Sequence, residues 1–143
     1  MFGSAGDRDR DKRPVMGAIA ARAADVVIVT DDTPHSEDPA PIRAHILAGA
    51  RAEADRIARE EGRTVVIEEV ADRAAAIRRA VELAGPQDGI LLAGRGHETT
   101  MDYDGELVPL DDRVALREAL AARVAAASAS GSGPAREGKV IES

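Results

Sequence analysis

Hydrophobic and polar positions along the chain alternate in blocks that predict strands and helices in turn. Three apolar runs, the first two rich in β-branched residues, are typical of strands buried on both faces of a sheet. They occupy residues 26–30, 64–67 and 89–93. Four segments with apolar residues at helical spacing are typical of amphipathic helices. They occupy residues 14–23, 39–59, 74–84 and a stretch from Asp111 or Asp112 through Val124.

This order predicts an α/β fold of the three-layer, Rossmann-like type, with a mostly parallel sheet and helices on both faces. The first six residues read as a strand end that opens into a glycine turn, so the first strand is expected to be truncated. Residues 101–103 and 106–108 flank Asp104-Gly105. That dipeptide favours a type I′ turn and predicts one antiparallel hairpin at the sheet edge.

The last part of the chain differs in composition from the rest. It is rich in Ser, Gly and Pro and has little apolar surface to bury. We therefore expect a domain over residues 1–126 and a disordered tail over residues 127–143.

Composition excludes several classes of partner. The net charge of −7, with one Phe, one Tyr and no Trp, offers neither a basic face for phosphates nor a stacking platform, so no nucleic acid is expected. No apolar run approaches the roughly 20 residues that span a bilayer, so no membrane partner is expected. The absence of cysteine excludes disulfides and thiolate metal sites and is compatible with a cytoplasmic location.

Charged loops follow three predicted strand ends. They occupy residues 3–13, 31–38 and 94–98. In parallel sheets such loops share one rim, where ligands bind. The loops offer guanidinium groups, carboxylates and glycine amides, a combination that suits a small amphoteric ligand such as an amino acid. These groups belong to Arg8, Arg10, Arg13, Asp31, Asp32, Glu98, Gly94 and Gly96. The alternative is a solvated acidic loop in which Ser36 or Asp38 caps the next helix.

Other chemistries have weaker support in the sequence. No G-x-x-x-x-G-K-[ST] phosphate loop is present, and Gly94-x-Gly96 lacks the third glycine of a dinucleotide fingerprint. His35 and His97 lack metal-ligand spacing, and no Ser-His-acid order indicates a nucleophile. We therefore expect no catalytic residue, no metal and no cofactor bound by this domain alone.

Three ordered motifs resemble a known family. They are Gly-Asp-Arg-Asp-Arg-Asp-Lys-Arg-Pro at 6–14, the acidic segment at 30–39 and Gly-Arg-Gly-His-Glu at 94–98, followed by Asp-Asp-Arg at 111–113. Over about residues 2–125 the chain is similar to the C-terminal domain of the Mur ligases, in particular the members that add a diamino acid.

The resemblance implies a reaction in peptidoglycan synthesis. ATP, with Mg²⁺, activates the terminal carboxyl of UDP-N-acetylmuramoyl-L-alanyl-D-glutamate as an acyl phosphate, and the amine of a diamino acid displaces phosphate. The C-terminal domain would deliver that amino acid. The N-terminal UDP-sugar domain and the central ATPase domain of the family are missing from these residues, so the chain is expected to be a fragment that is inactive alone.

The resemblance also implies residue roles. Arg8 would bind a carboxylate of the amino acid, Gly94 and Glu98 would hold its distal amine end, and Thr33 with His35 would face the far side-chain terminus. Asp32 belongs to the same binding set.

One departure leaves the amino acid open. Diaminopimelate-adding members have aspartate-asparagine-proline-arginine where this chain has Asp32-Thr33-Pro34-His35. Meso-diaminopimelate, lysine, ornithine and a shorter diamino acid all remain candidates. Two other readings also remain: a stand-alone, non-catalytic binding module with the same fold, and the terminal domain of a folylpolyglutamate synthase-like ligase.

Overall fold

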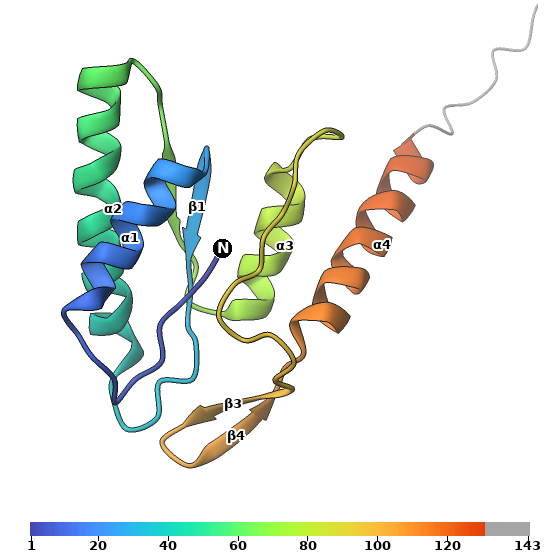
Figure 1. Ribbon diagram of the computed structural model, residues 1–143. Coiled ribbons are helices and arrows are strands. Elements are labelled where there is room, and N and C mark those ends of the chain that lie inside the picture. The colour runs from blue at the N-terminus through green and yellow to red at the C-terminus, as the bar shows by residue number, and fades with distance from the viewer. Residues whose placement is uncertain (131–143) are drawn as a thin grey trace, which may run out of the picture.

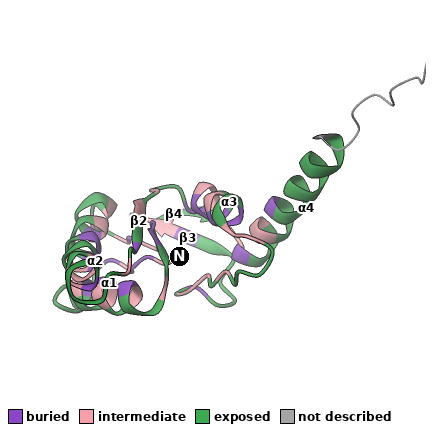
Figure 2. Cartoon of the chain, turned by 90° about the horizontal axis from the view of Figure 1, so that it is seen from above, coloured by how far each residue is buried: buried purple, intermediate pink, exposed green. Residues whose placement is uncertain are grey.

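The computed structural model describes residues 1–130 and shows an α/β fold in three layers, with strands between two pairs of helices (Figures 1 and 2). The parallel strands are β1 (Val26–Val29) and β2 (Val66–Glu69). On one side lie α1 (Lys12–Ala23) and α2 (Pro39–Glu61), and on the other lie α3 (Arg73–Leu83) and α4 (Asp112–Ser130). A hairpin of β3 (Thr100–Tyr103) and β4 (Glu106–Pro109) lies at one end of the molecule.

The start of the chain lies beside β1. Phe2 pairs in parallel with Val29, on the edge of β1 opposite β2. On its other side, the Met1 ammonium donates to the carbonyl oxygen of Leu91 at 2.8 Å, and the amide of Ala93 donates to the Met1 carbonyl oxygen at 3.1 Å. The order across the middle layer is therefore β2, β1, Met1–Phe2 and then the segment that contains Leu91.

The alternation of side chains along β1 explains the two helical layers. Val27 and Val29 are buried in one apolar cluster with residues of α1 and α2, whereas Ile28 is buried in another with Ala76 and Ala80 of α3. Successive strand residues point to opposite faces, so a continuous apolar run can be buried only between two layers. The predicted three-layer architecture is confirmed.

Two predictions about the sheet need correction. Residues 89–93 do not form a strand in the described part of the chain, because only Met1 lies beside them and its two hydrogen bonds are too few for a ladder. The hairpin is present, with the positive φ angles of 53° at Asp104 and 86° at Gly105 that a type I′ turn requires. However, it forms its own two-stranded sheet and is not an edge of the parallel one.

Element boundaries also differ from expectation at two places. The predicted strand 64–67 lies two residues later, at Val66–Glu69, where it pairs in register with β1. The expected disordered tail 127–143 is wrong for residues 127–130, which continue α4 because its last turns are rich in alanine, the strongest helix former. The rest of that tail lies outside the described residues. Within residues 1–130, no helix has the length and apolar content to cross a bilayer.

Candidate functional site at the loop rim

Three charged loops, far apart in the sequence, meet at one end of the molecule. The amide of Gly6 donates to the carbonyl oxygen of Thr33 at 3.0 Å. The hydroxyl and the amide of Ser36 donate to the carboxylate of Asp7 at 2.8 and 3.1 Å. The guanidinium of Arg95 donates to Oγ1 of Thr33 at 3.3 Å. The predicted convergence is confirmed, and we call this surface the loop rim. It comprises residues 3–13, 31–38 and 94–98.

The first two loops approach too closely for a side chain at Gly6. A Cβ atom built there would lie 1.7 Å from the carbonyl oxygen of Pro34, well inside any contact distance. Asp7 and His35, on either side of this contact, both have a φ angle of 52°. Asp and His are among the residues that tolerate this left-handed conformation best. The contact therefore depends on which residue types stand at these positions.

Glu37 forms ion pairs with two arginines of the first loop. Its carboxylate accepts two hydrogen bonds from the buried guanidinium of Arg13, at 2.9 and 3.1 Å, and one from the amide of Asp7 at 2.8 Å. Arg10 lies 3.4 Å from the same carboxylate. The hydrogen bond from Arg13 is the main cause that lowers the pKa of Glu37 from 4.5 to about 2. Arg13 and Arg10 therefore both have a carboxylate partner within the protein. Arg8 is exposed, and no described residue pairs with it.

Arg95 joins the third loop to the second. Its side chain is buried and donates to the carbonyl oxygens of Thr100 at 2.9 Å and Leu110 at 3.0 Å. The same guanidinium lies 3.8 Å from the carboxylate of Asp32 and 3.6 Å from that of Glu98. The sequence reading did not include Arg95 among the site residues. Its position between two glycines, in a charged turn after an apolar run, was the available signal.

His35 connects the second loop to the hairpin. Its Nδ1 lies 3.1 Å from Oδ2 of Asp102, and its amide donates to the Asp102 carbonyl oxygen at 3.1 Å. The amide of Asp104 donates to the carbonyl oxygen of His35 at 2.7 Å. Hydrogen bonds from the amide of Gly105 and from His35 lower the pKa of Asp102. The ring is 37% exposed, so it is attached to the hairpin and still accessible.

The carboxylate of Asp31 has its partners within the protein. Its carboxylate pairs with Arg43 and accepts a hydrogen bond from the hydroxyl of Tyr103 at 3.2 Å. Arg43 also donates to Glu69 at 2.8 Å. Burial, followed by the charge of Asp31, raises the pKa of Tyr103 to about 12, so this phenol stays protonated and donates. Asp31 is therefore not free to receive a ligand cation.

A buried ion pair between Arg73 and Asp112 contacts the loop rim. Arg73 donates to both carboxylate oxygens of Asp112, at 2.9 and 2.7 Å, and to the carbonyl oxygens of Asp31 at 3.2 Å and Ala93 at 3.1 Å. The guanidinium of Arg95 lies 3.8 Å from the same carboxylate. The segment after β1, residue Ala93 and the start of α4 are therefore held by one cation. Arg43, Tyr103, Arg73 and Asp112 were all absent from the sequence-based site.

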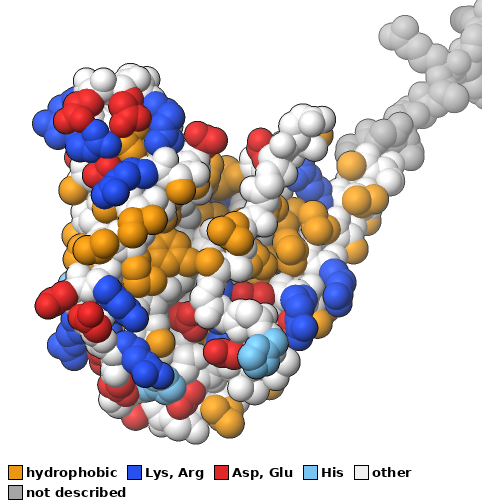
Figure 3. Space-filling model, in the orientation of Figure 1, with side chains coloured by type: hydrophobic (Ala, Val, Ile, Leu, Met, Phe, Trp, Pro, Cys, Tyr) orange, Lys and Arg blue, Asp and Glu red, His pale blue; other side chains and the backbone are white. Residues whose placement is uncertain are grey.

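The six predicted binding residues are found on one rim. Asp32, Thr33 and Glu98 surround Arg95, and a Cβ atom on Gly94, whose φ is 109°, would lie 2.8 Å from Oδ2 of Asp32. His35 lies on the same loop as Asp32 and Thr33, and Arg8 lies on the loop of residues 3–13. Acidic, basic and histidine side chains gather at this end of the molecule below a band of hydrophobic side chains (Figure 3). Within residues 1–130, no group of three His, Asp or Glu side chains is arranged to hold a metal ion.

The chain has clear similarity to known proteins. Residues 1–96 match the family described as Mur ligase, glutamate ligase domain. The chain is 51% identical over 120 residues to UDP-N-acetylmuramoyl-L-alanyl-D-glutamate--2,6-diaminopimelate ligase of Corynebacterium efficiens, covering 84% of this chain and 22% of that protein. It is 50% identical over 121 residues to UDP-N-acetylmuramyl-tripeptide synthetase of Roseiflexus sp., covering 85% of this chain and 23% of that protein.

A solved structure supports the same relationship. A structure of a UDP-N-acetylmuramoyl-L-alanyl-D-glutamate--2,6-diaminopimelate ligase superposes with a TM-score of 0.69 at 36% identity, covering 86% of this chain and 23% of that one. The chain thus spans less than a quarter of the length of the relatives that it matches.

Proposed function

Because this chain belongs to the Mur ligase family and matches its glutamate ligase domain, we propose that its loop rim binds the free diamino acid that an ATP-dependent ligase joins to UDP-N-acetylmuramoyl-L-alanyl-D-glutamate. The other substrate and the amide-forming reaction are taken from the names of its relatives. The domain's own part is to hold the amino acid and present its amine.

The observation that carries this function is the distribution of free and committed charges on the rim. Arg13 and Arg10 pair with Glu37, whereas Arg8 is exposed and pairs with no described residue, so it is available for a carboxylate. Glu98 is about half exposed and lies 3.6 Å from Arg95, so its carboxylate can still accept from an ammonium. An exposed cation and an exposed carboxylate, on loops that both contact residues 31–38, match the two ends of an amino acid.

The chemistry of amide formation defines what the domain contributes. The amine nitrogen attacks the activated carbonyl carbon, phosphate leaves with the electrons of the broken C–O bond, and the nitrogen loses a proton. Holding the amine close to the acyl group converts a two-body encounter into a positioned attack. ATP and Mg²⁺ would be bound by other domains of the full-length enzyme. We therefore expect neither amide formation nor ATP hydrolysis from this chain alone.

The side chain at position 35 bears on which diamino acid is bound. Arginine would offer a permanently charged fork to a second carboxylate, whereas histidine offers no such fork. Here the ring is also engaged with Asp102. Losing a charged hydrogen bond costs about 1.5 to 3 kcal/mol. Lysine, ornithine or a shorter diamino acid should therefore compete well with diaminopimelate.

Calorimetric titration of the purified chain with lysine, ornithine and meso-diaminopimelate tests this function. Arg8→Ala should weaken binding of the preferred amino acid by about tenfold or more, as expected for loss of a charged hydrogen bond. The matched variant Arg10→Ala, in the same loop, should bind within about twofold of the parent, because it removes a cation already shared with Glu37. Equal losses from both variants, or no binding of any diamino acid by the parent, would contradict the assignment.

A second substitution tests the choice of amino acid. His35→Arg should improve the affinity for diaminopimelate relative to lysine by about tenfold, because it supplies a cation for the second carboxylate. His35→Asn is the control, since asparagine also tolerates the left-handed backbone and adds no charge. Strong selectivity of the parent chain for diaminopimelate over lysine would show that position 35 does not decide the choice.

A further inference from the structure

The carboxylate of Asp102, on the hairpin, lies beside the ring of His35. Its Oδ2 atom lies 3.1 Å from Nδ1 of His35, and its Oδ1 atom accepts a hydrogen bond from the amide of Gly105 at 2.7 Å. Within the described part of the chain, no lysine or arginine forms an ion pair with it. By contrast, Asp31 and Glu37 of the second loop are each paired with an arginine. Asp102 therefore brings a negative charge to the loop rim that no permanent cation of the described chain neutralises.

The position of this carboxylate is fixed relative to the second loop. The amide of His35 donates to the carbonyl oxygen of Asp102, and the amide of Asp104 donates to the carbonyl oxygen of His35. The hydroxyl of Tyr103 donates to the carboxylate of Asp31 and forms a second attachment. The charge of Asp102 is thus held at a defined place beside position 35, although the hairpin forms a separate sheet.

The carboxylate is also charged and open to a ligand. The Asp102 side chain is 30% exposed. Hydrogen bonds, first from the amide of Gly105 and then from His35, lower its pKa, so it is ionised at neutral pH. Asp7 of the first loop places a second carboxylate nearby, and its hydrogen-bond partner is Ser36 instead of a cation. Two carboxylates without an arginine or lysine partner therefore lie around His35.

We propose that Asp102 determines specificity at the diamino acid site by disfavouring a substrate that has a carboxylate beside its distal amine. This inference rests on the proposed function, in which His35 faces the far end of the amino acid. Lysine and ornithine end in an ammonium alone, which a fixed carboxylate attracts. Meso-diaminopimelate adds a second carboxylate at that end, which the same fixed charge repels, and such repulsion is a source of specificity. The histidine at position 35 and the charge of Asp102 then act in the same direction.

The test measures the ratio of the dissociation constants of meso-diaminopimelate and lysine by calorimetric titration of the purified chain. Asp102→Asn removes the charge and keeps an oxygen for the amide of Gly105. It should shift the ratio by about tenfold in favour of diaminopimelate, because a like-charge contact is removed. Asp102→Ser, which also keeps an acceptor, should shift the ratio in the same direction. A purely structural effect would weaken both amino acids alike and leave the ratio unchanged.

The matched control is Asp104→Asn, in the same hairpin. Asp104 is exposed, and asparagine tolerates its φ angle of 53°. This variant also removes one negative charge from the hairpin, but not the one beside His35. Its ratio should stay within about twofold of the parent's.

A double substitution tests the contact between the two positions. An arginine at position 35 of the parent would pair with Asp102, whereas in the Asp102→Asn variant it would be free to bind the second carboxylate. His35→Arg should therefore increase the affinity for diaminopimelate at least about threefold more in the Asp102→Asn background than in the parent.

Two results would overturn this inference alone: an unchanged ratio in both uncharged variants of Asp102, or equal gains from His35→Arg in the two backgrounds. Failure of the parent to bind either amino acid would overturn the proposed function together with the role given to Asp102.

Discussion

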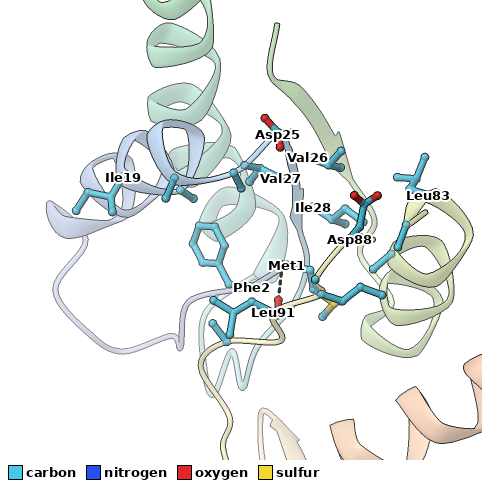
Figure 4. A pocket seen from close by; sticks show the side chains of 18 of the residues that line it. Met1, Phe2, Ile19, Asp25, Val26, Val27, Ile28, Leu83, Asp88 and Leu91 are labelled. Atoms are coloured by element: carbon cyan, nitrogen blue, oxygen red, sulfur yellow. Dashed lines mark hydrogen bonds between the residues drawn. The ribbon is translucent and has the colours of Figure 1, made fainter. Parts of the chain in front are cut away.

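The two ends of the parallel sheet differ in what they leave open. At the loop rim, charged groups are numerous and many are engaged: Glu37 with Arg13, Asp31 with Arg43, and Arg95 with its surrounding carboxylates and carbonyls. At the opposite end lies an apolar groove of about 690 Å³ between α1 and α3, with Met1, Ile19, Leu83 and Leu91 among its lining residues (Figure 4). The same few strands therefore carry a prearranged polar surface at one end and an open apolar groove at the other.

This difference separates two kinds of recognition. A small zwitterion needs a few groups fixed in advance, because each charged contact must overcome the hydration of both partners. An apolar groove needs no such fixed groups, because burial of apolar surface is non-directional. Substitutions of the same kind should consequently have unequal effects at the two ends.

Replacing glycine by alanine at each end should show the largest contrast. Gly6→Ala places a carbon 1.7 Å from a backbone oxygen at the rim and should cost about 5 kcal/mol or prevent folding. Gly89→Ala at the groove meets nothing within 4 Å and should change stability by less than about 0.5 kcal/mol. Urea unfolding of both variants measures the difference. A stable Gly6→Ala variant would show that the first two loops are not held as described.

Removing the buried cation of the rim should have the next largest effect. Arg95→Met leaves the carboxylate of Asp32 without its counter-charge and the carbonyl oxygens of Thr100 and Leu110 without their donor, and should cost about 3 kcal/mol. Arg78→Met, at an exposed position of α3, is the control and should cost less than about 0.5 kcal/mol. Similar unfolding free energies for the two variants would mean that Arg95 does not hold the rim together.

Acid should weaken the rim through Glu37. The pKa of this carboxyl is lowered in the folded chain from 4.5 to about 2, so its contribution is complete above pH 4.5 and is lost as the pH falls toward 2. Glu37→Gln should therefore flatten the fall of unfolding free energy within that pH window. Thermal unfolding of parent and variant at several pH values measures the slopes, and parallel slopes would contradict the role given to Glu37.

A substitution at the groove should have the smallest effect on the chain as it stands. Leu91→Ser changes a side chain that is 74% exposed, so the melting temperature should move by no more than the equivalent of about 0.5 kcal/mol. A fall in melting temperature as large as that caused by Arg95→Met would show that the Leu91 side chain is packed more tightly than its exposure indicates.

The same contrast explains what the sequence could predict. Helix positions, the hairpin turn at Asp104-Gly105 and the cap of α2 follow from local patterns, and Asp38 does cap that helix. Residues 89–93 have a strand-like composition but lack neighbours for a ladder, which local pattern cannot reveal. The end of α4 was predicted too early, because the serine and glycine residues that follow outweighed the alanine content of its last turns.

The loop rim was predicted in outline and missed in detail. The convergence of three loops follows from parallel topology, which the order of elements indicates. Which polar groups pair with one another does not follow from the order of elements. Partners such as Arg95 and Thr33, or Tyr103 and Asp31, are 62 and 72 residues apart in the sequence. Only the folded chain distinguishes Arg8, which is left free, from Arg13, which is buried.

Mapping of diamino acid binding by NMR tests the central claim most directly. When the ¹⁵N-labelled chain is titrated with lysine or meso-diaminopimelate, the largest amide shifts should fall on the loop rim, at Arg8, Thr33 and Glu98, and should leave Val26 and Leu91 unchanged. Norleucine, which lacks the distal amine, should produce smaller shifts at Glu98. Shifts confined to the apolar groove, or shifts that norleucine reproduces in full, would contradict the assignment of the loop rim as a diamino acid site.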